Sequence, residues 1–158
     1  MGSEMCIRDR STGDERYRRS LYTFSKRTAP FAAFTTFVAP TGENYEVRRS
    51  RSNTPLQALT LLNDEMYLEM AVALGKAAAN VGETSEERIE FMFRRLLTRD
   101  PMEVELARLV EFYEKQLDRI QRGILSAKKI DEAASPEHSA LTLVARVLMN
   151  LDEVITQH

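Results

Sequence analysis

The sequence predicts a mainly α-helical protein, in which a cluster of four to five helices follows an irregular, extended arm. Two observations carry this prediction. From residue 54 onward, apolar residues recur at spacings of three and four, the repeat of a helix with one buried face. Residues 11–53 lack that repeat and are rich in arginine, aromatic residues and proline, which is typical of extended or irregular chain. With 158 residues, the chain is long enough for one domain with a real core.

Charge is divided unevenly between these two parts. Residues 1–53 hold ten Lys and Arg against six Asp and Glu, residues 54–158 hold twelve against eighteen, and the formal net charge is −2. Either the basic and acidic parts attract each other within the fold, or the basic part binds a partner. The small net charge predicts no general attraction to nucleic acid or to an anionic membrane. No run approaches the roughly 20 apolar residues that a membrane span needs.

The first ten residues, MGSEMCIRDR, resemble translated sequencing-adapter read-through. We therefore expect the native sequence to begin near Ser11 and to be the C-terminal fragment of a longer polypeptide. On this expectation, the lack of a signal peptide carries no information. The single cysteine, Cys6, lies in this stretch and has no partner for an internal disulfide.

Residues 21–40 are the most aromatic part of the arm. Residues 22–24 and 34–38 are rich in aromatic and β-branched types and are predicted to be extended, with a short hairpin as one arrangement. Pro30 and Pro40 keep the residues before them out of helical conformation. A charged link then leads to the helical domain, residues 54–158.

The first long helix is predicted to begin at Thr54. Pro55 suits the first helical position, and Gln57 completes a capping box with Thr54. At Asn63 and Asp64 the helix either breaks and restarts with Asp64 as a cap, or continues with a kink. It is predicted to run on through residues 65–79. Its apolar stripe is predicted at Leu56, Leu59, Leu62 and then at Met66 or Met70.

Three further helices are predicted from their start signals. Thr84 with Glu87 is a second capping box, Asp100-Pro101 is predicted to cap the next helix, and Ser135-Pro136 the last. The predicted apolar faces are Ile89, Met92, Phe93, Leu96 and Leu97; then Leu106, Val110, Tyr113, Leu117, Ile120 and Ile124; then Leu141, Val144, Leu148, Leu151 and Ile155. The middle set follows a 3.5-residue repeat, which is typical of coiled-coil-like packing.

Signatures of catalysis are absent from the sequence. Its six glycines form no phosphate-binding loop and no Gly-x-Ser-x-Gly elbow. Two histidines, His138 and His158, are too few for a histidine-based triad or zinc site, and no Cys-x-x-Cys-His segment is present to attach haem c. We therefore predict no catalytic residue, no metal site and no cofactor in this chain.

Two features of the basic arm keep a binding role open. An arginine cluster, Arg48, Arg49 and Arg51, precedes a helix N-terminus. It binds a carboxylate, phosphate or carbohydrate, or it pairs with acids of the helical part. Aromatic residues beside basic ones either stack bases or sugars, or pack the arm against the helices. These aromatic residues are Tyr22, Phe24, Phe31, Phe34 and Phe37.

Two short polar corners are the remaining candidates. Asn63 and Asp64 interrupt the first helix, and Asp152 and Glu153 fall in the predicted C-terminal turn of the last, where the helix dipole disfavours acids. If the corners meet in the fold, they form an acid/base pair or a calcium site. Otherwise they serve as caps and salt-bridge partners.

Several segments, in this order, resemble the planctomycete-type C-terminal domain of unknown function DUF1553, found in PSD1-like, cytochrome-c-associated proteins. They are RRSLYTF at 18–24, KRT at 26–28, RR at 48–49, NTPLQAL at 53–59, LND at 62–64, LTRDP at 97–101 and LMNLDE at 148–153. The resemblance covers most of residues 16–156. The family often has proline where Glu65 stands, which would enforce a helix restart after Asp64.

The resemblance implies a secreted or periplasmic multidomain protein with an upstream cytochrome-c-like module, so that any haem c lies outside this chain. Our leading hypothesis is a non-catalytic helical module that packs against upstream domains of the same polypeptide. The alternative is part of an enzyme acting on polysaccharide or a related substrate, in which Arg48, Arg51, Asp64 or Asp152 completes an active site built upstream. The sequence contains nothing that sets the oligomeric state.

Overall fold

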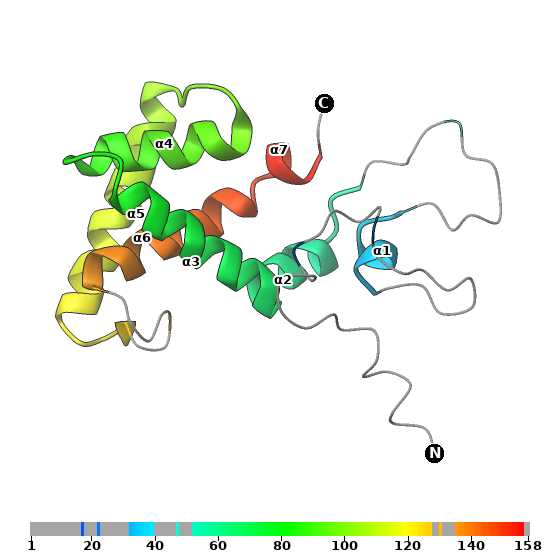
Figure 1. The fold of residues 1–158 in the computed structure, drawn as a ribbon, viewed down its shortest axis with the longest axis horizontal. Helices are drawn as coiled ribbons and strands as arrows, with labels where there is room; N and C mark the ends of the chain where they lie inside the picture. The colour runs from blue at the N-terminus through cyan, green and yellow to red at the C-terminus, as the bar shows by residue number, and fades with distance from the viewer. Residues whose placement is uncertain are drawn as a thin grey trace, which may run out of the picture. The chain divides into compact units, whose positions relative to one another are not determined.

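The computed structural model describes Tyr17, Tyr22, residues 32–39, Val47, residues 52–127, Ile130 and residues 135–156. These described residues form seven α-helices and no strand (Figure 1), which confirms the predicted mainly α-helical class. The helices are α1 (Ala32–Thr36), α2 (Pro55–Asn63), α3 (Glu65–Ala79), α4 (Ser85–Leu97), α5 (Glu103–Gln121), α6 (Pro136–Met149) and α7 (Asp152–Ile155). The chain divides into two compact units, Met1–Gln57 and Ala58–His158, and α2 begins in the first and continues into the second.

The segment predicted to be extended at residues 34–38 is instead α1 and the turn that follows it. Ala39 N donates to Phe34 O at 2.7 Å, and Val38 ends the helix with a positive φ of 51°. The prediction was wrong because it followed β-propensity alone. A strand needs a partner to satisfy its backbone groups, whereas this turn satisfies them locally.

The predicted start of α2 is confirmed. Thr54 N donates to Gln57 Oε1 at 2.9 Å, and Gln57 N donates to Thr54 Oγ1 at 3.3 Å, so both halves of the capping box are present. Gln57 is also buried, at 2% exposure, and its Nε2 donates to Thr36 O at 2.9 Å. One side chain thus caps α2 and satisfies a carbonyl at the end of α1.

The break between α2 and α3 occurs at Asp64, which decides between the two predicted alternatives. Asp64 has an extended backbone and accepts a hydrogen bond from Met66 N at 2.9 Å, as an N-cap does. Asn63 closes α2 by donating from Nδ2 to Leu59 O at 2.9 Å. The helix therefore restarts here although Glu65 stands where a proline would enforce the restart.

The centre of the second unit is α6, which crosses α3 (Figure 1) and makes its most extensive contacts with α3 and then with α5. Its sequence is apolar around most of its circumference, as expected for a helix enclosed by others. Its buried residues are Ser139, Ala140, Leu141, Thr142, Val144, Ala145, Leu148 and Met149. On α3, the buried side facing this core is built of small residues: Ala71, Gly75 and Ala78.

The other two long helices complete the core. Thr84 and Glu87 form the predicted capping box of α4, and Ile89, Met92 and Phe93 are buried as predicted. In α5, Tyr113 and Ile120 are buried. The structure corrects the start of α5, because the N-cap is Met102 rather than Asp100, and Glu105 accepts a hydrogen bond from Met102 N at 2.8 Å.

The last predicted helix is split in two, which corrects its C-terminal end. Asn150 ends α6, Leu151 is the N-cap of α7, and the acids Asp152 and Glu153 open α7. Both acids therefore lie at a helix N-terminus, where the helix dipole favours them, and the predicted electrostatic conflict does not arise.

Four predicted core positions lie at the surface instead. Leu56 and Leu59 of α2 are 61% and 56% exposed, Met70 of α3 is 44% exposed, and Ile124, beyond the end of α5, is 66% exposed. Helical spacing identifies a shared face but not whether other chain covers that face. Among the described residues, no helix combines the length and apolar composition that crossing a membrane requires.

Candidate functional site

The predicted arginine cluster lies outside the described residues. Arg48, Arg49 and Arg51 therefore remain a sequence prediction, both as an anion site and as salt-bridge partners of the helical part. The aromatic residues of the arm are described only in part, at Tyr22, Phe34 and Phe37.

The polar corner at Asn63 and Asp64 has a structural role in the described chain. The side-chain hydrogen bonds of both residues stay within α2 and α3, where they end one helix and begin the next. The nearby Tyr67 hydroxyl has a raised pKa because it is partly buried and, to a lesser extent, because the Asp64 charge opposes its ionisation.

The second polar corner binds a different partner. Glu153 accepts hydrogen bonds from Arg99, from Nη2 at 2.8 Å and from Nε at 3.1 Å. Asp152 contributes its main-chain oxygen to Thr156 N at 2.8 Å. The two corners thus contact different partners, and no shared carboxylate site is seen in the described chain.

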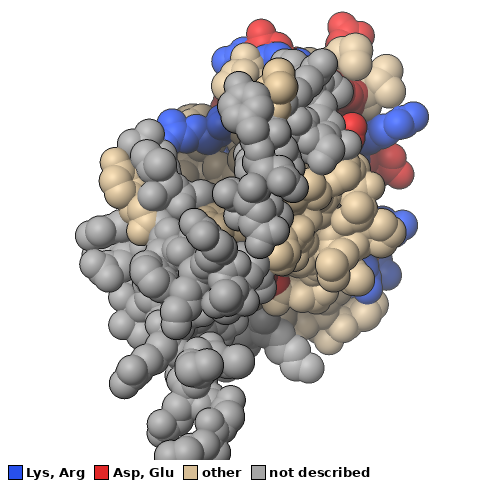
Figure 2. Space-filling model, turned by 90° about the vertical axis from the view of Figure 1, so that its right-hand side faces the viewer, with Lys and Arg blue, Asp and Glu red and all other residues tan. Residues whose placement is uncertain are grey.

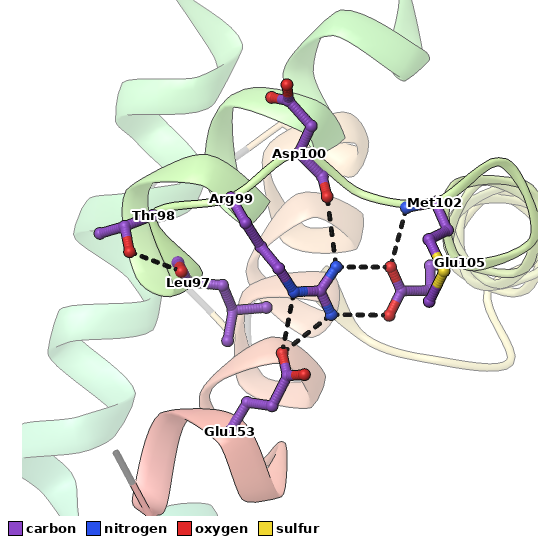
Figure 3. A network of polar contacts seen from close by, with 7 residues as sticks. All are labelled: Leu97, Thr98, Arg99, Asp100, Met102, Glu105 and Glu153. Atoms are coloured by element: carbon purple, nitrogen blue, oxygen red, sulfur yellow. Dashed lines mark hydrogen bonds and ion pairs between the residues drawn. The ribbon is translucent and has the colours of Figure 1, made fainter. Parts of the chain in front are cut away.

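The strongest polar arrangement in the described chain centres on Arg99 (Figure 3), and we call Arg99, Glu105 and Glu153 the Arg99 cluster. Arg99 lies between α4 and α5, Glu105 on α5 and Glu153 on α7. The guanidinium binds Glu105 through two parallel bonds of 2.9 Å, and its remaining donors reach Glu153 and the carbonyl of Asp100. This two-bond geometry is the strong form of an arginine–carboxylate pair.

The backbone before Arg99 sets the direction of its side chain. Thr98, the C-cap of α4, has a left-handed conformation with φ of 57°, and its N donates to Arg94 O at 2.9 Å. Asp100 pairs with Arg94 and so anchors the other side of the turn. Below the guanidinium, the centroid of the Phe93 ring lies 4.8 Å from Arg99 Cζ, which adds a cation–π contact to the core.

The titration behaviour of the Arg99 cluster follows from its geometry. Hydrogen bonding by Arg99, and then by Met102 N, lowers the pKa of Glu105 from 4.5 to about 2. The same bonds from Glu105 and Glu153 raise the pKa of Arg99. Catalytic acids and bases need a pKa near the working pH. Shifts in these directions hold each group in its charged form, so the arrangement favours binding and positioning over proton transfer.

A second polar arrangement lies around an open hollow of about 310 Å³. Its apolar lining comes from α2, α5, α6 and the chain after α5: Leu62, Phe112, Leu125, Leu143 and Val147. Its polar lining is Gln116, Arg119 and Arg146. Arg146 Nη2 donates to Leu62 O, and Arg119 Nη1 donates to Gln116 Oε1 at 3.0 Å.

Several charged side chains on the surface pair with an opposite charge. Arg88 and Glu137 pair at 3.5 Å, and Arg122 and Asp118 pair at 2.8 Å. On the face drawn in Figure 2, basic and acidic side chains of the described part lie beside each other at the edges of an uncharged area. Within the described ranges, no group of three or more His, Cys, Asp or Glu residues is arranged to hold a metal ion.

Sequence reasoning missed both arrangements. Arg99 falls within the LTRDP segment, but nothing local identifies Glu153 as its partner, because the two residues are 54 positions apart. Arg146 lies in the mostly apolar C-terminal half of its helix, which was the one available signal, since an arginine in such a stretch must find acceptors or reach solvent.

Comparison with known proteins identifies a family. A family model described as "PSD1: Protein of unknown function (DUF1553)" matches residues 3–113, which is most of the chain. The matched range ends within α5, so α6 and α7 lie beyond it. No curated protein and no solved structure matches the chain.

Proposed function

We propose, from the premise that this chain belongs to the PSD1 family of unknown function (DUF1553), that it is a non-catalytic helical module of a larger protein. In this proposal the module packs against upstream domains of the same polypeptide and helps to position them. The observation that supports it is the use of the candidate carboxylates. Asp64 caps α3, and Glu153 is bound to Arg99, so both serve the fold.

The Arg99 cluster supports the same proposal. It joins the α4–α5 turn to α7 across the surface of the helical unit, through three charged side chains and the Phe93 ring. Such a network fixes the relative positions of chain segments that have few other contacts, and α7 is only four residues long. A rigid surface of this kind suits a role in packing against another domain.

The alternative is that Arg48, Arg51, Asp64 or Asp152 completes the active site of an enzyme acting on polysaccharide or a related substrate. The two proposals differ in what Asp64→Asn does in the longer polypeptide. Asparagine caps a helix about as well as aspartate, so the substitution removes the charge and keeps the fold. Unchanged turnover of a polysaccharide panel supports the packing role, whereas lost turnover with an unchanged unfolding midpoint supports the enzyme.

The same comparison extends to Arg48, Arg51 and Asp152. Each is replaced by alanine in the longer polypeptide, and each variant is checked for an unchanged unfolding midpoint before turnover is measured. Loss of activity at one of these positions without loss of stability would overturn the non-catalytic proposal. Turnover of a glycan or ester by the 158-residue chain alone would overturn it as well.

We also propose that the longer protein is extracytoplasmic and carries an upstream cytochrome-c-like module. This rests on the family resemblance of the sequence segments described above. Reading the upstream coding sequence on the same genomic contig tests it. A signal peptide and a Cys-x-x-Cys-His segment are expected there, and an upstream sequence with neither would refute the proposal.

A further inference from the structure

The open hollow between α5 and α6 contains two arginines with no acidic partner. Within the described part of the chain, no carboxylate lies in ion-pair range of Arg119 or Arg146. Neutral acceptors hold the two guanidinium groups instead, the Gln116 side chain for one and a main-chain oxygen for the other. Neutral acceptors orient an arginine without cancelling its charge.

Most of the N–H groups of Arg146 have no hydrogen-bond acceptor within the described chain. One of its five N–H groups is used by Leu62 O, and its Nε is buried without any hydrogen-bond partner. A buried donor that lacks an acceptor is unfavourable, and the large majority of such groups in folded proteins are satisfied. Because Nε is enclosed by the chain, an acceptor in the hollow would bond the Nη N–H groups of Arg146 that Leu62 O leaves without a partner.

The walls of the hollow are apolar. Phe112 and Leu143 face it from α5 and α6, and Leu62, Leu125 and Val147 complete its lining. Its volume of about 310 Å³ is at the lower end of the range of roughly 300–1,000 Å³ typical of small-ligand sites. Such sites are mostly apolar, with a few polar groups that fix the orientation of the ligand.

From this combination we propose that the hollow is a binding site for a small apolar carboxylic acid. The carboxylate bonds the guanidinium groups of Arg119 and Arg146, and the apolar body of the ligand lies against Phe112 and Leu143. Charge complementarity selects an acid over a neutral molecule of the same shape. The inference does not depend on the proposed packing role, because the hollow uses none of the residues assigned to that role.

The probe for this site is 4-phenylbutyrate, with its neutral amide, 4-phenylbutanamide, as the matched ligand. Each is titrated into the complete 158-residue chain labelled with ¹⁵N, and the backbone amide resonances are followed by NMR. The acid is expected to shift resonances of residues that line the hollow, Phe112, Gln116 and Leu143 among them, with a Kd on the order of 1 mM. The amide is expected to bind at least about fivefold more weakly.

Two variants and a control locate the carboxylate. Arg119→Gln and Arg146→Gln are each expected to weaken binding of the acid by at least about fivefold. Arg122→Gln removes the same charge from the end of α5, but this residue is exposed, paired with Asp118 and outside the hollow, so no change is expected. If Arg146→Gln unfolds the chain, Arg119→Gln and the amide decide the question.

Three results would overturn the proposal. The first is the absence of shifts among the lining residues when the acid is in tenfold excess over its expected Kd. The second is equal binding of the acid and the amide. The third is a loss of affinity in Arg122→Gln as large as that in Arg119→Gln, which would show a general charge effect.

Discussion

At Gly75, α3 lies close to Thr142 of α6, and replacement of this glycine by alanine tests the packing of the two helices. A Cβ atom at residue 75 would lie 2.9 Å from Thr142 Oγ1, 3.1 Å from Thr142 N and 3.3 Å from Thr142 Cα. Thr142 cannot easily move away from an added Cβ atom. Its hydroxyl donates to His138 O at 2.9 Å, and the other two atoms belong to the α6 backbone.

The expected effect is the difference between two opposed contributions. Alanine is favoured over glycine within a helix by roughly 1 kcal/mol, whereas overpacking a well-filled core costs about 1–3 kcal/mol. We expect Gly75→Ala to lower the free energy of unfolding by about 1 kcal/mol. For a chain of this length, that is a fall in Tm of about 2–4 °C.

Urea denaturation followed by circular dichroism measures the change, provided that the slope of the transition is the same in each variant. Ala73→Gly, at an exposed position of the same helix, measures the propensity contribution alone. Thr142→Ala combined with Gly75→Ala removes the 2.9 Å contact, so the double variant is expected to lose less than the sum of the single variants. If Gly75→Ala is more stable than the parent chain by the roughly 1 kcal/mol that helix propensity alone would give, the close approach of the two helices is refuted.

Three further substitutions test local features. Gly123 has a φ of 73° and no atom within 4 Å of an added Cβ, so Gly123→Ala should cost about 1 kcal/mol for conformational reasons alone; an unchanged urea midpoint would contradict this. Thr98 has a positive φ of 57°, and Thr98→Gly should raise the free energy of unfolding by about 0.5 kcal/mol; a decrease would show that the side chain matters more than the strain. The pKa of Glu105 is about 2 in the folded chain and 4.5 ordinarily, so its ion pair stabilises the fold above pH 4.5 and that contribution is lost as the pH falls towards 2. Glu105→Gln should therefore reduce the loss of stability over this pH window, and an unchanged pH dependence would refute the assignment.

The local features of the fold could be predicted because their causes lie within a few residues of chain. The capping boxes at Thr54 and Thr84 each depend on a partner three positions later. The Asn63 and Asp64 break depends on hydrogen bonds to Leu59 and Met66. Such interactions form in whatever tertiary setting the helices take.

The exposure of one face of α2 and the helical conformation of α1 could not be predicted from local pattern. Leu56 and Leu59 follow a helical stripe, yet the stripe is exposed, because spacing carries no information about what covers a face. Residues 34–38 favour a strand individually, but a strand needs a partner, and a turn closed by its own hydrogen bonds needs none.

The sequence by itself determined the helical class of this protein, the helix starts at Thr54, Thr84 and Ser135, and the family to which it belongs. The tertiary structure alone decided which polar groups from distant parts of the sequence meet. Arg99 binds Glu153 across 54 positions, and Arg146 reaches Leu62 across 84. The physical reason is that a cap is fixed by the geometry of one helical turn, whereas a distant pair forms only where the packing of α6 against α3 and α5 has already brought the segments together.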